Sequence, residues 1–241
     1  RFTPVALSVA SKCTIDEVVE LVCDAVREAS AEHDIDVRLI VSINRHESLA
    51  IGRDMLRAAI RYKDRGVVGL DLAGRETNFP ASLFRDLFTR AIAEGLFVTI
   101  HAGEWAGAQS VWDAVGNLGA NRVGHGVRVM EDRGIVEILQ QRAIVLEVCP
   151  TSNVHSGIFP TLGDHPLPKM IESGLKVTIN TDDPLISGIT LSDEMAYVVD
   201  HMQVTFDNLK QYTLNAAEAA FLPDDERKTL VDKFKTLLDK S

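Results

Sequence analysis

Short apolar runs alternate along this chain with longer segments of helical periodicity, and this alternation limits the folds available to it. The β-branched and apolar runs predict six strands, at residues 37–43, 67–72, 97–101, 122–124, 144–148 and 177–180. Strands that alternate with helices of about 10 to 15 residues form βαβ units, in which the strands run parallel. The pattern therefore predicts a parallel α/β sheet.

Helices are expected between and after these strands. The predicted segments are residues 14–32, 51–62, 82–94, 109–118, 131–141 and 169–173, followed by helices that start at Ser192, Phe206 and Asp224. Thr14 and Glu17 have the spacing of a capping box at the start of the first helix. At the beginning of the chain, Arg1 and Phe2 resemble the end of a strand, and Pro4 ends this extended piece.

Polar residues that can do chemistry follow the C-terminal ends of successive strands. They are Asp71, Gly74 and Glu76, then His101 and Glu104, then His125, then Cys149, Ser152 and Asn153, and finally Asp182 and Asp183. An open doubly wound sheet gathers such residues at one crevice, whereas a barrel brings every strand end to one mouth. We therefore expect a TIM (β/α)8 barrel that lacks its first strand and most of its second, with residues 1–241 forming a single N-terminally truncated domain.

Composition and charge exclude several classes of partner. The formal charge of −10 and the pI near 5.2 argue against nucleic acid or an anionic membrane, because both demand a basic surface. The chain contains no apolar run of the roughly 18 residues that a membrane-spanning helix needs. Its three cysteines are not in CxxC spacing, which favours free thiols in a reducing compartment. We expect a cytoplasmic protein that binds a small neutral or cationic molecule.

The strand-end residues include a set that suits a metal. Two histidines and two aspartates from three strands, with a glutamate nearby, are a combination that zinc accepts. Zinc lowers the pKa of a bound water from about 15.7 to about 7, which makes a hydroxide available near neutral pH. Taken alone, His101 also fits a half-buried histidine bonded to a carbonyl, and the Asp182–Asp183 pair also fits a solvated turn before Pro184.

Five motifs in chain order carry a resemblance to a known family. They are DLAG at residues 71–74, HAGE at 101–104, GHG at 124–126, CPTSN at 149–153 and NTDDP at 180–184. Together with NAAEAAFLPDDER at residues 215–227, they resemble the adenosine deaminase family, zinc-dependent barrel enzymes of the metal-dependent hydrolase superfamily. The similarity covers essentially the whole chain. It implies conversion of adenosine and 2′-deoxyadenosine to inosine-type products plus ammonia, by zinc-hydroxide attack at purine C6.

The resemblance also implies a role for individual residues. His101 and Asp182 are expected to be ligands of one Zn²⁺ ion per chain. His125 is expected to orient the zinc-bound water and to help deprotonate it. Glu104 is expected to protonate N1 of the purine, which removes the aromatic resistance of C6 to attack. Glu104 must then be protonated when substrate binds, and a partly desolvated, apolar setting beside Trp105 favours this.

Two further contacts to the purine are implied: the Asp183 side chain to N7 and the backbone of Gly74 to N3.

The sequence departs from the family pattern in two places. Arg75 follows DLAG where the family usually has an acidic residue. The chain also contains no His-x-His pair, which supplies the family's other two zinc ligands. The chain is then either a fragment whose first strands lie outside this sequence or a degenerate relative. We expect the fragment, and we expect this polypeptide to bind zinc poorly.

Other readings stay open at this stage. The same fold serves adenine deaminases and aminofutalosine deaminases, and DLAG, rather than a serine-rich turn, favours adenosine among them. A barrel that binds a nucleoside or a partner protein without turnover is an alternative of another class. The expected partner is a small purine nucleoside, and the sequence predicts nothing about oligomeric state.

Overall fold

Six strands alternate with helices in the computed structural model, which describes residues 1–240. The strands are β1 (Leu39–Asn44), β2 (Val67–Ala73), β3 (Phe97–Ala102), β4 (Arg122–His125), β5 (Val145–Val148) and β6 (Lys176–Ile179). Every predicted strand is present, with ends that differ by one or two residues. The chain divides into two compact units, the first made of residues 1–101 and 113–121 and the second of residues 102–112 and 122 onward. That residues 1–241 form one domain stays a prediction.

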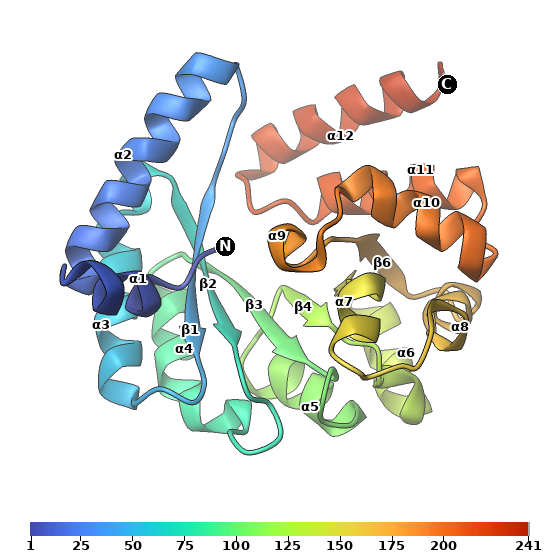
Figure 1. Ribbon diagram of the computed structural model, residues 1–241, viewed down its shortest axis with the longest axis horizontal. Coiled ribbons are helices and arrows are strands. Elements are labelled where there is room, and N and C mark those ends of the chain that lie inside the picture. Colours follow the sequence, from blue (N-terminus) through green and yellow to red (C-terminus); the bar gives the residue numbers. More distant parts are fainter. Residues whose placement is uncertain (241) are drawn as a thin grey trace. The chain divides into compact units, whose positions relative to one another are not determined.

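The first unit is built on three parallel strands. β1 pairs with β2, and β2 pairs with β3, in parallel register. The helices of this unit are α1 (Pro4–Ser11), α2 (Ile15–His33), α3 (Leu49–Arg61) and α4 (Arg85–Ala93). Helix α3 packs against β1 and β2 and against α2 (Figure 1). The strands are buried on both faces, as parallel strands under helices must be.

The expected strand end at the start of the chain is confirmed. Phe2 forms an isolated parallel bridge with Val41 in β1. Its N–H donates to the carbonyl of Ile40, and its carbonyl accepts from the N–H of Ser42, at 3.1 and 2.8 Å. The extended piece ends at Thr3, as predicted, but helix α1 begins at Pro4, where no helix was predicted.

The second unit contains the other three strands and most of the helices. β5 pairs in parallel with β4 on one side and with β6 on the other. The helices are α5 (Ala108–Trp112), α6 (Arg133–Gln141), α7 (Pro150–His155), α8 (Leu167–Glu172), α9 (Pro184–Ser187), α10 (Leu191–Met202), α11 (Phe206–Glu218) and α12 (Asp224–Leu238). Helices α8, α10 and α11 pack against β6, and α12 packs against α11 (Figure 1).

Local sequence signals explain most helix boundaries. The predicted capping box is present: the Thr14 side chain accepts from the N–H of Glu17, whose carboxylate accepts from the N–H of Thr14. The predicted helix at 82–94 begins instead as a 3-10 turn, Ala81–Phe84, before α4. The predicted helix at 109–118 is α5 followed by a π-helical turn, Asp113–Asn117.

One partly buried arginine joins β4 and β5 to the end of α11. Arg122 pairs with Glu147 at 3.0 Å, and its guanidinium also donates to the carbonyl of Ala219 at 2.9 Å. It lies 3.6 Å from the ring centroid of Phe221. The strands around it are apolar, and Val123, Leu146 and Val148 are fully buried. No helix within residues 1–240 has both the length and the apolarity that a membrane crossing needs.

Candidate active site

A buried carboxylate in the first unit holds His101 at the end of β3. Oδ1 of Asp71 lies 3.1 Å from Nδ1 of His101, and the Ser42 hydroxyl donates to Oδ2 at 2.6 Å. Asp71 is fully buried. Burial raises the pKa of this carboxyl, but the charges of His101 and Arg1 and the two hydrogen bonds outweigh it and hold the pKa well below its usual range. Asp71 is therefore an ionised acceptor.

The contact with Asp71 decides which nitrogen of His101 is presented outward. Nδ1 faces the carboxylate, so Nε2 is the nitrogen that points away from it, toward the guanidinium of Arg1 at 3.4 Å. Arg45 donates to the His101 carbonyl at 2.5 Å, which fixes the main chain at this point. A histidine whose second nitrogen is bonded to a carboxylate has the usual arrangement of a metal-binding histidine.

Gly74 ends the DLAG turn of the first unit and has a conformation that only glycine adopts easily. Its φ angle is 88°, and a Cβ placed on it would lie 2.8 Å from Nδ1 of His46. The backbone at residue 74 is thus approached closely by its neighbours. Arg75, the residue that departs from the family pattern, follows directly.

Two loops of the second unit lie side by side and bring Glu104 to His125. The N–H of Gly126 donates to the carbonyl of Ala102 at 3.0 Å, and the N–H of Arg128 donates to that of Gly103 at 2.9 Å. With the loops joined in this way, Oε2 of Glu104 lies 3.5 Å from Nε2 of His125. The side chain of Glu104 is only 14% exposed, whereas Trp105 is 45% exposed.

Asp182 approaches His125 from the other side. Its Oδ2 atom lies 3.9 Å from Nε2 of His125 and accepts from the hydroxyl of Ser152 at 2.7 Å. Asp183 is exposed and begins helix α9, where its carbonyl accepts from the N–H groups of Ile186 and Ser187. The second unit thus brings Glu104, His125 and Asp182 together, with Asp183 at its surface.

Both His125 and Asp182 have strained backbone. Their φ angles are 60° and 58°, in the left-handed region that non-glycine residues rarely adopt. Most of the other non-glycine residues with positive φ in residues 1–240, such as Asp34 and Gln203, end helices. His125 is instead the last residue of β4, and Asp182 lies in the loop after β6. Strain of this kind, about 1 to 3 kcal/mol per residue, persists mainly at functional sites.

Two residues that the sequence analysis left without a role lie behind His125. Nδ2 of Asn153 lies 3.1 Å from Nδ1 of His125, and Oδ1 of Asn153 lies 3.2 Å from Nε2 of His165. All three side chains are buried. Asn153 carried a signal, because it follows β5 within a motif. His165 carried none, because it lies in a loop far along the chain from any strand end.

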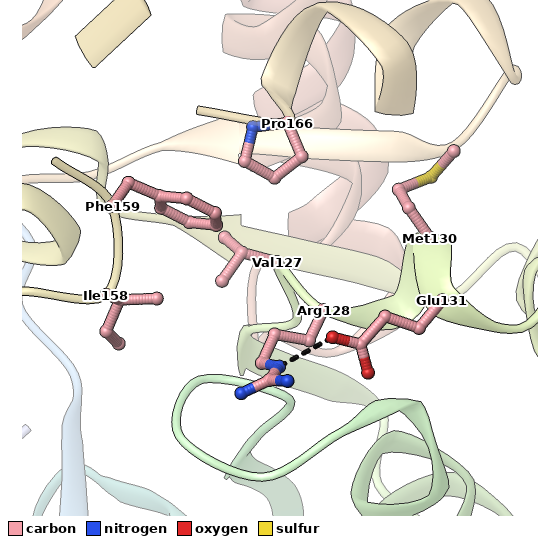
Figure 2. Close-up of a pocket in the computed structure, with 7 residues that line it drawn as sticks. All are labelled: Val127, Arg128, Met130, Glu131, Ile158, Phe159 and Pro166. Atoms are coloured by element: carbon pink, nitrogen blue, oxygen red, sulfur yellow. Dashed lines mark hydrogen bonds and ion pairs between the residues drawn. The ribbon is translucent and has the colours of Figure 1, made fainter. Parts of the chain in front are cut away.

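A pocket of about 400 Å³ opens beside the loop that follows His125. Phe159 and Ile158 lie on one side of it, and Met130 and Glu131 lie on the other (Figure 2). Arg128 pairs with Glu131 at 2.8 Å at its edge. The ring of Phe159 also packs edge-on against His165, at 5.0 Å between centroids. The pocket and the residues behind His125 therefore share a wall.

Comparison with known proteins identifies what this arrangement is similar to. The model of the family described as adenosine deaminase matches residues 1–237. The adenosine deaminase of Salmonella schwarzengrund is 38% identical over 233 residues, which are 97% of this chain and 70% of that protein. A closely similar match, at 37% identity over 98% of this chain, is the adenosine deaminase of Serratia proteamaculans, of which 70% is covered.

Solved structures show the same fold. The adenine deaminase of Arthrobacter aurescens has a TM-score of 0.89 at 28% identity, over 98% of this chain and 72% of its own. An amidohydrolase from Burkholderia ambifaria with bound Zn has a TM-score of 0.87 at 27% identity, over 99% and 68% of the two chains. These likenesses and the six parallel strands confirm the predicted α/β fold of the barrel type.

Proposed function

Because the chain belongs to the adenosine deaminase family, we propose that it hydrolyses the 6-amino group of adenosine and 2′-deoxyadenosine. The products are inosine or 2′-deoxyinosine, and ammonia. The chain spans about 70% of the length of the curated relatives that it matches, so the proposal is limited to the residues of this chain. The substrate is a small purine nucleoside, and the three free cysteines of residues 1–240 favour the cytoplasm as its location.

The observation that supports this proposal most strongly is the position of His125. Its Nε2 atom faces two carboxylates, Glu104 at 3.5 Å and Asp182 at 3.9 Å, and the ring is 2% exposed. Deamination needs an acid for the purine and a group that holds the attacking water, both within reach of one carbon atom. Glu104 and His125 have the chemistry and the proximity for these two tasks.

Zinc is the cofactor that we propose, with His101 and Asp182 as ligands of one ion per chain. The donor set fits: Asp71 bonds Nδ1 of His101, so that Nε2 is the nitrogen that would bind a metal, and Ser152 orients the Asp182 carboxylate. A bound zinc ion supplies a deprotonated water as the nucleophile near neutral pH. A four-coordinate site needs further ligands, and this chain carries no His-x-His pair to provide them.

The remaining roles belong to side chains and backbone of this chain. Glu104 donates a proton to N1 of the purine, which makes C6 electrophilic. His125 holds the attacking water in line with C6. Asp183, exposed at the start of α9, makes a hydrogen bond to N7 of the substrate, with its carboxyl group as the donor because N7 can only accept, and the exposed main chain of Gly74 contacts N3. Each of these roles is carried over from the family motif at the same position.

The test follows ammonia release and the change in ultraviolet absorbance when the zinc-saturated protein is mixed with adenosine. We expect turnover that depends on zinc. In Glu104→Gln, an amide of the same shape replaces the acid, so the rate should fall by about 100-fold or more. The control is Glu172→Gln, the same chemical change at an exposed position on α8, which should leave the rate unchanged.

Either of two results contradicts the proposal. One is the absence of zinc-dependent ammonia release from any 6-aminopurine. The other is an equal rate in the wild-type protein and in Glu104→Gln. Binding of adenosine without turnover at saturating zinc indicates a non-catalytic nucleoside-binding barrel instead.

Adenine is the second candidate substrate, because the adenine deaminase of Arthrobacter aurescens matches the fold with a TM-score of 0.89. Its 28% identity is lower than the 38% of the adenosine deaminase relative, which favours adenosine. Parallel assays with adenosine, adenine and aminofutalosine separate the three. A higher kcat/KM for adenine or aminofutalosine than for adenosine assigns the chain to that activity.

A further inference from the structure

Three buried polar side chains form a continuous hydrogen-bonded row in the second unit. The row runs from His125 through Asn153 to His165, with atom separations of 3.1 and 3.2 Å. It ends at the backbone N–H of Leu167, which donates to Nδ1 of His165 at 3.1 Å. The exposed fractions of the three side chains are 2%, 0% and 3%, so water does not compete for these bonds.

The hydrogen bond at the far end of the row, between Leu167 and His165, can run in only one direction. A peptide N–H can donate but cannot accept, so Nδ1 of His165 carries no proton. Burial lowers the pKa of His165 to about 3, so the ring is neutral near pH 7 and has one proton. That proton is on Nε2. His165 therefore donates through Nε2, and the partner atom on Asn153 is its acceptor, Oδ1.

The direction of the bond between His165 and Asn153 then determines the direction of the bond between Asn153 and His125. Once Oδ1 of Asn153 faces His165, its amide NH₂ faces Nδ1 of His125. An amide NH₂ only donates, so Nδ1 of His125 accepts. Reversal of the amide would place its NH₂ against the Nε2–H of His165, so that two donors would face each other. The row thus allows one protonation pattern at its near end.

We propose that Asn153 and His165 are positioning residues that fix His125 as the tautomer with its proton on Nε2. In this form the Nε2–H of His125 points at Glu104 and Asp182, the two carboxyl groups that face it in the second unit. Its consequence for the reaction, which rests on the proposed function, is that His125 donates a hydrogen bond to the attacking water. The ring has no lone pair on that side with which to remove a proton, so this proposal keeps the orienting role that the family resemblance implies for His125 and replaces its role in deprotonation.

Nitrogen-15 NMR of the histidine rings tests the proposal in the wild-type protein at neutral pH. Two-bond proton–nitrogen correlations distinguish a protonated ring nitrogen from a bare one, and single His→Gln variants assign the seven histidines. We expect bare Nδ1 and protonated Nε2 for both His125 and His165. A protonated Nδ1 on His125 overturns the proposal, whether or not the protein deaminates adenosine.

Asn153→Asp tests the direction of the row. Both oxygens of the aspartate accept, so it still accepts from Nε2–H of His165 but now requires a donor from His125. We expect the proton of His125 to appear on Nδ1 while the His165 spectrum stays unchanged. Asn208→Asp is the control, because Asn208 accepts in the capping box of α11 and an aspartate serves equally well there.

The variants also separate a positioning role from a merely structural one. Asn153→Asp should change the tautomer of His125 in a protein that still folds, and kcat should fall while KM changes little. An Asn153→Asp spectrum that matches the wild type, with Nε2 of His125 still protonated, overturns the proposal. If Asn153→Asp does not fold, the wild-type spectrum decides the matter alone. A failure of the deaminase assay leaves the tautomer result untouched, so the two proposals fail separately.

Discussion

Two residues of the candidate site have backbone conformations that non-glycine residues rarely adopt. His125 and Asp182 have positive φ, and each turns the chain sharply at the point where a strand has ended. That turn directs the imidazole of His125 toward Glu104 instead of along β4. Asp182 is directed to Nε2 of His125 in the same way. The strain is therefore an observation that separates these residues from other polar residues at strand ends.

His165 is expected to make the protein sensitive to acid. Burial lowers its pKa from 6.5 to about 3, so the folded state binds this proton less tightly than the unfolded state does. The stability associated with the neutral ring is fully present above pH 6.5. It declines as the pH falls from there toward 3, by up to about 1.4 kcal/mol per pH unit.

Urea unfolding at a series of pH values checks this prediction. His165→Gln should have a shallower fall of the unfolding free energy below pH 6.5 than the wild type. His201→Gln, at an exposed position on α10, should follow the wild-type curve. Parallel curves for the wild type and His165→Gln would contradict the assignment of this acid sensitivity to His165.

At the scale of elements, local signals made the strands and long helices predictable. The six strands are short runs rich in β-branched residues, and their ends moved by only one or two positions. Helices α7 and α9 were not predicted, because they have six and four residues and start at Pro150 and Pro184. Such short helices have no periodicity to detect, and the chain folds into them where a strand-end loop needs its N–H groups satisfied.

The capping box of α2 gives a prediction at this scale. Thr14→Ala removes the acceptor for the N–H of Glu17, so the free energy of unfolding should fall by about 1 kcal/mol. Glu17→Gln keeps an acceptor for the N–H of Thr14 and should change stability much less. Chemical denaturation followed by far-ultraviolet circular dichroism measures both. Equal losses in the two variants would show that the threonine hydroxyl is not the stabilising group.

The candidate site was predictable only where its residues lie in motifs at strand ends. His101 and His125 lie at the C-terminal ends of β3 and β4, and Glu104 and Asp182 lie in the loops after β3 and β6. A parallel sheet collects such positions at one edge. Asp71 was noticed but not connected to His101, because the 3.1 Å contact depends on the register of β2 with β3. His165 was missed because its bond to Asn153 is a tertiary contact that no local spacing encodes.

For the whole molecule, zinc is expected to raise thermal stability. A ligand that binds only the folded state stabilises it by about 1.4 kcal/mol for each tenfold excess over its dissociation constant. His101→Ala should abolish the zinc-dependent rise in Tm, and a chelator should reverse it in the wild type. Because the two ligands that we propose would make an incomplete tetrahedral site, we expect the rise only at high zinc concentrations.

The control for this measurement is His33→Ala, at an exposed position at the end of α2. It should keep the full rise in Tm. A rise that is identical in His101→Ala and His33→Ala would assign the zinc effect to another part of the chain, and the proposed ligand role of His101 would be lost.

The backbone N–H of Leu167 has a role that side-chain substitutions cannot reveal. Every replacement other than proline keeps the N–H that donates to His165, so a mutational scan would classify this fully buried position as packing alone. Replacing that one amide with an ester, at constant side chain, would remove the donor to His165. The tautomer of His125, two hydrogen bonds beyond His165, would then no longer be fixed. In our proposal, the position of the proton on the His125 ring thus depends on a backbone N–H at the first residue of α8.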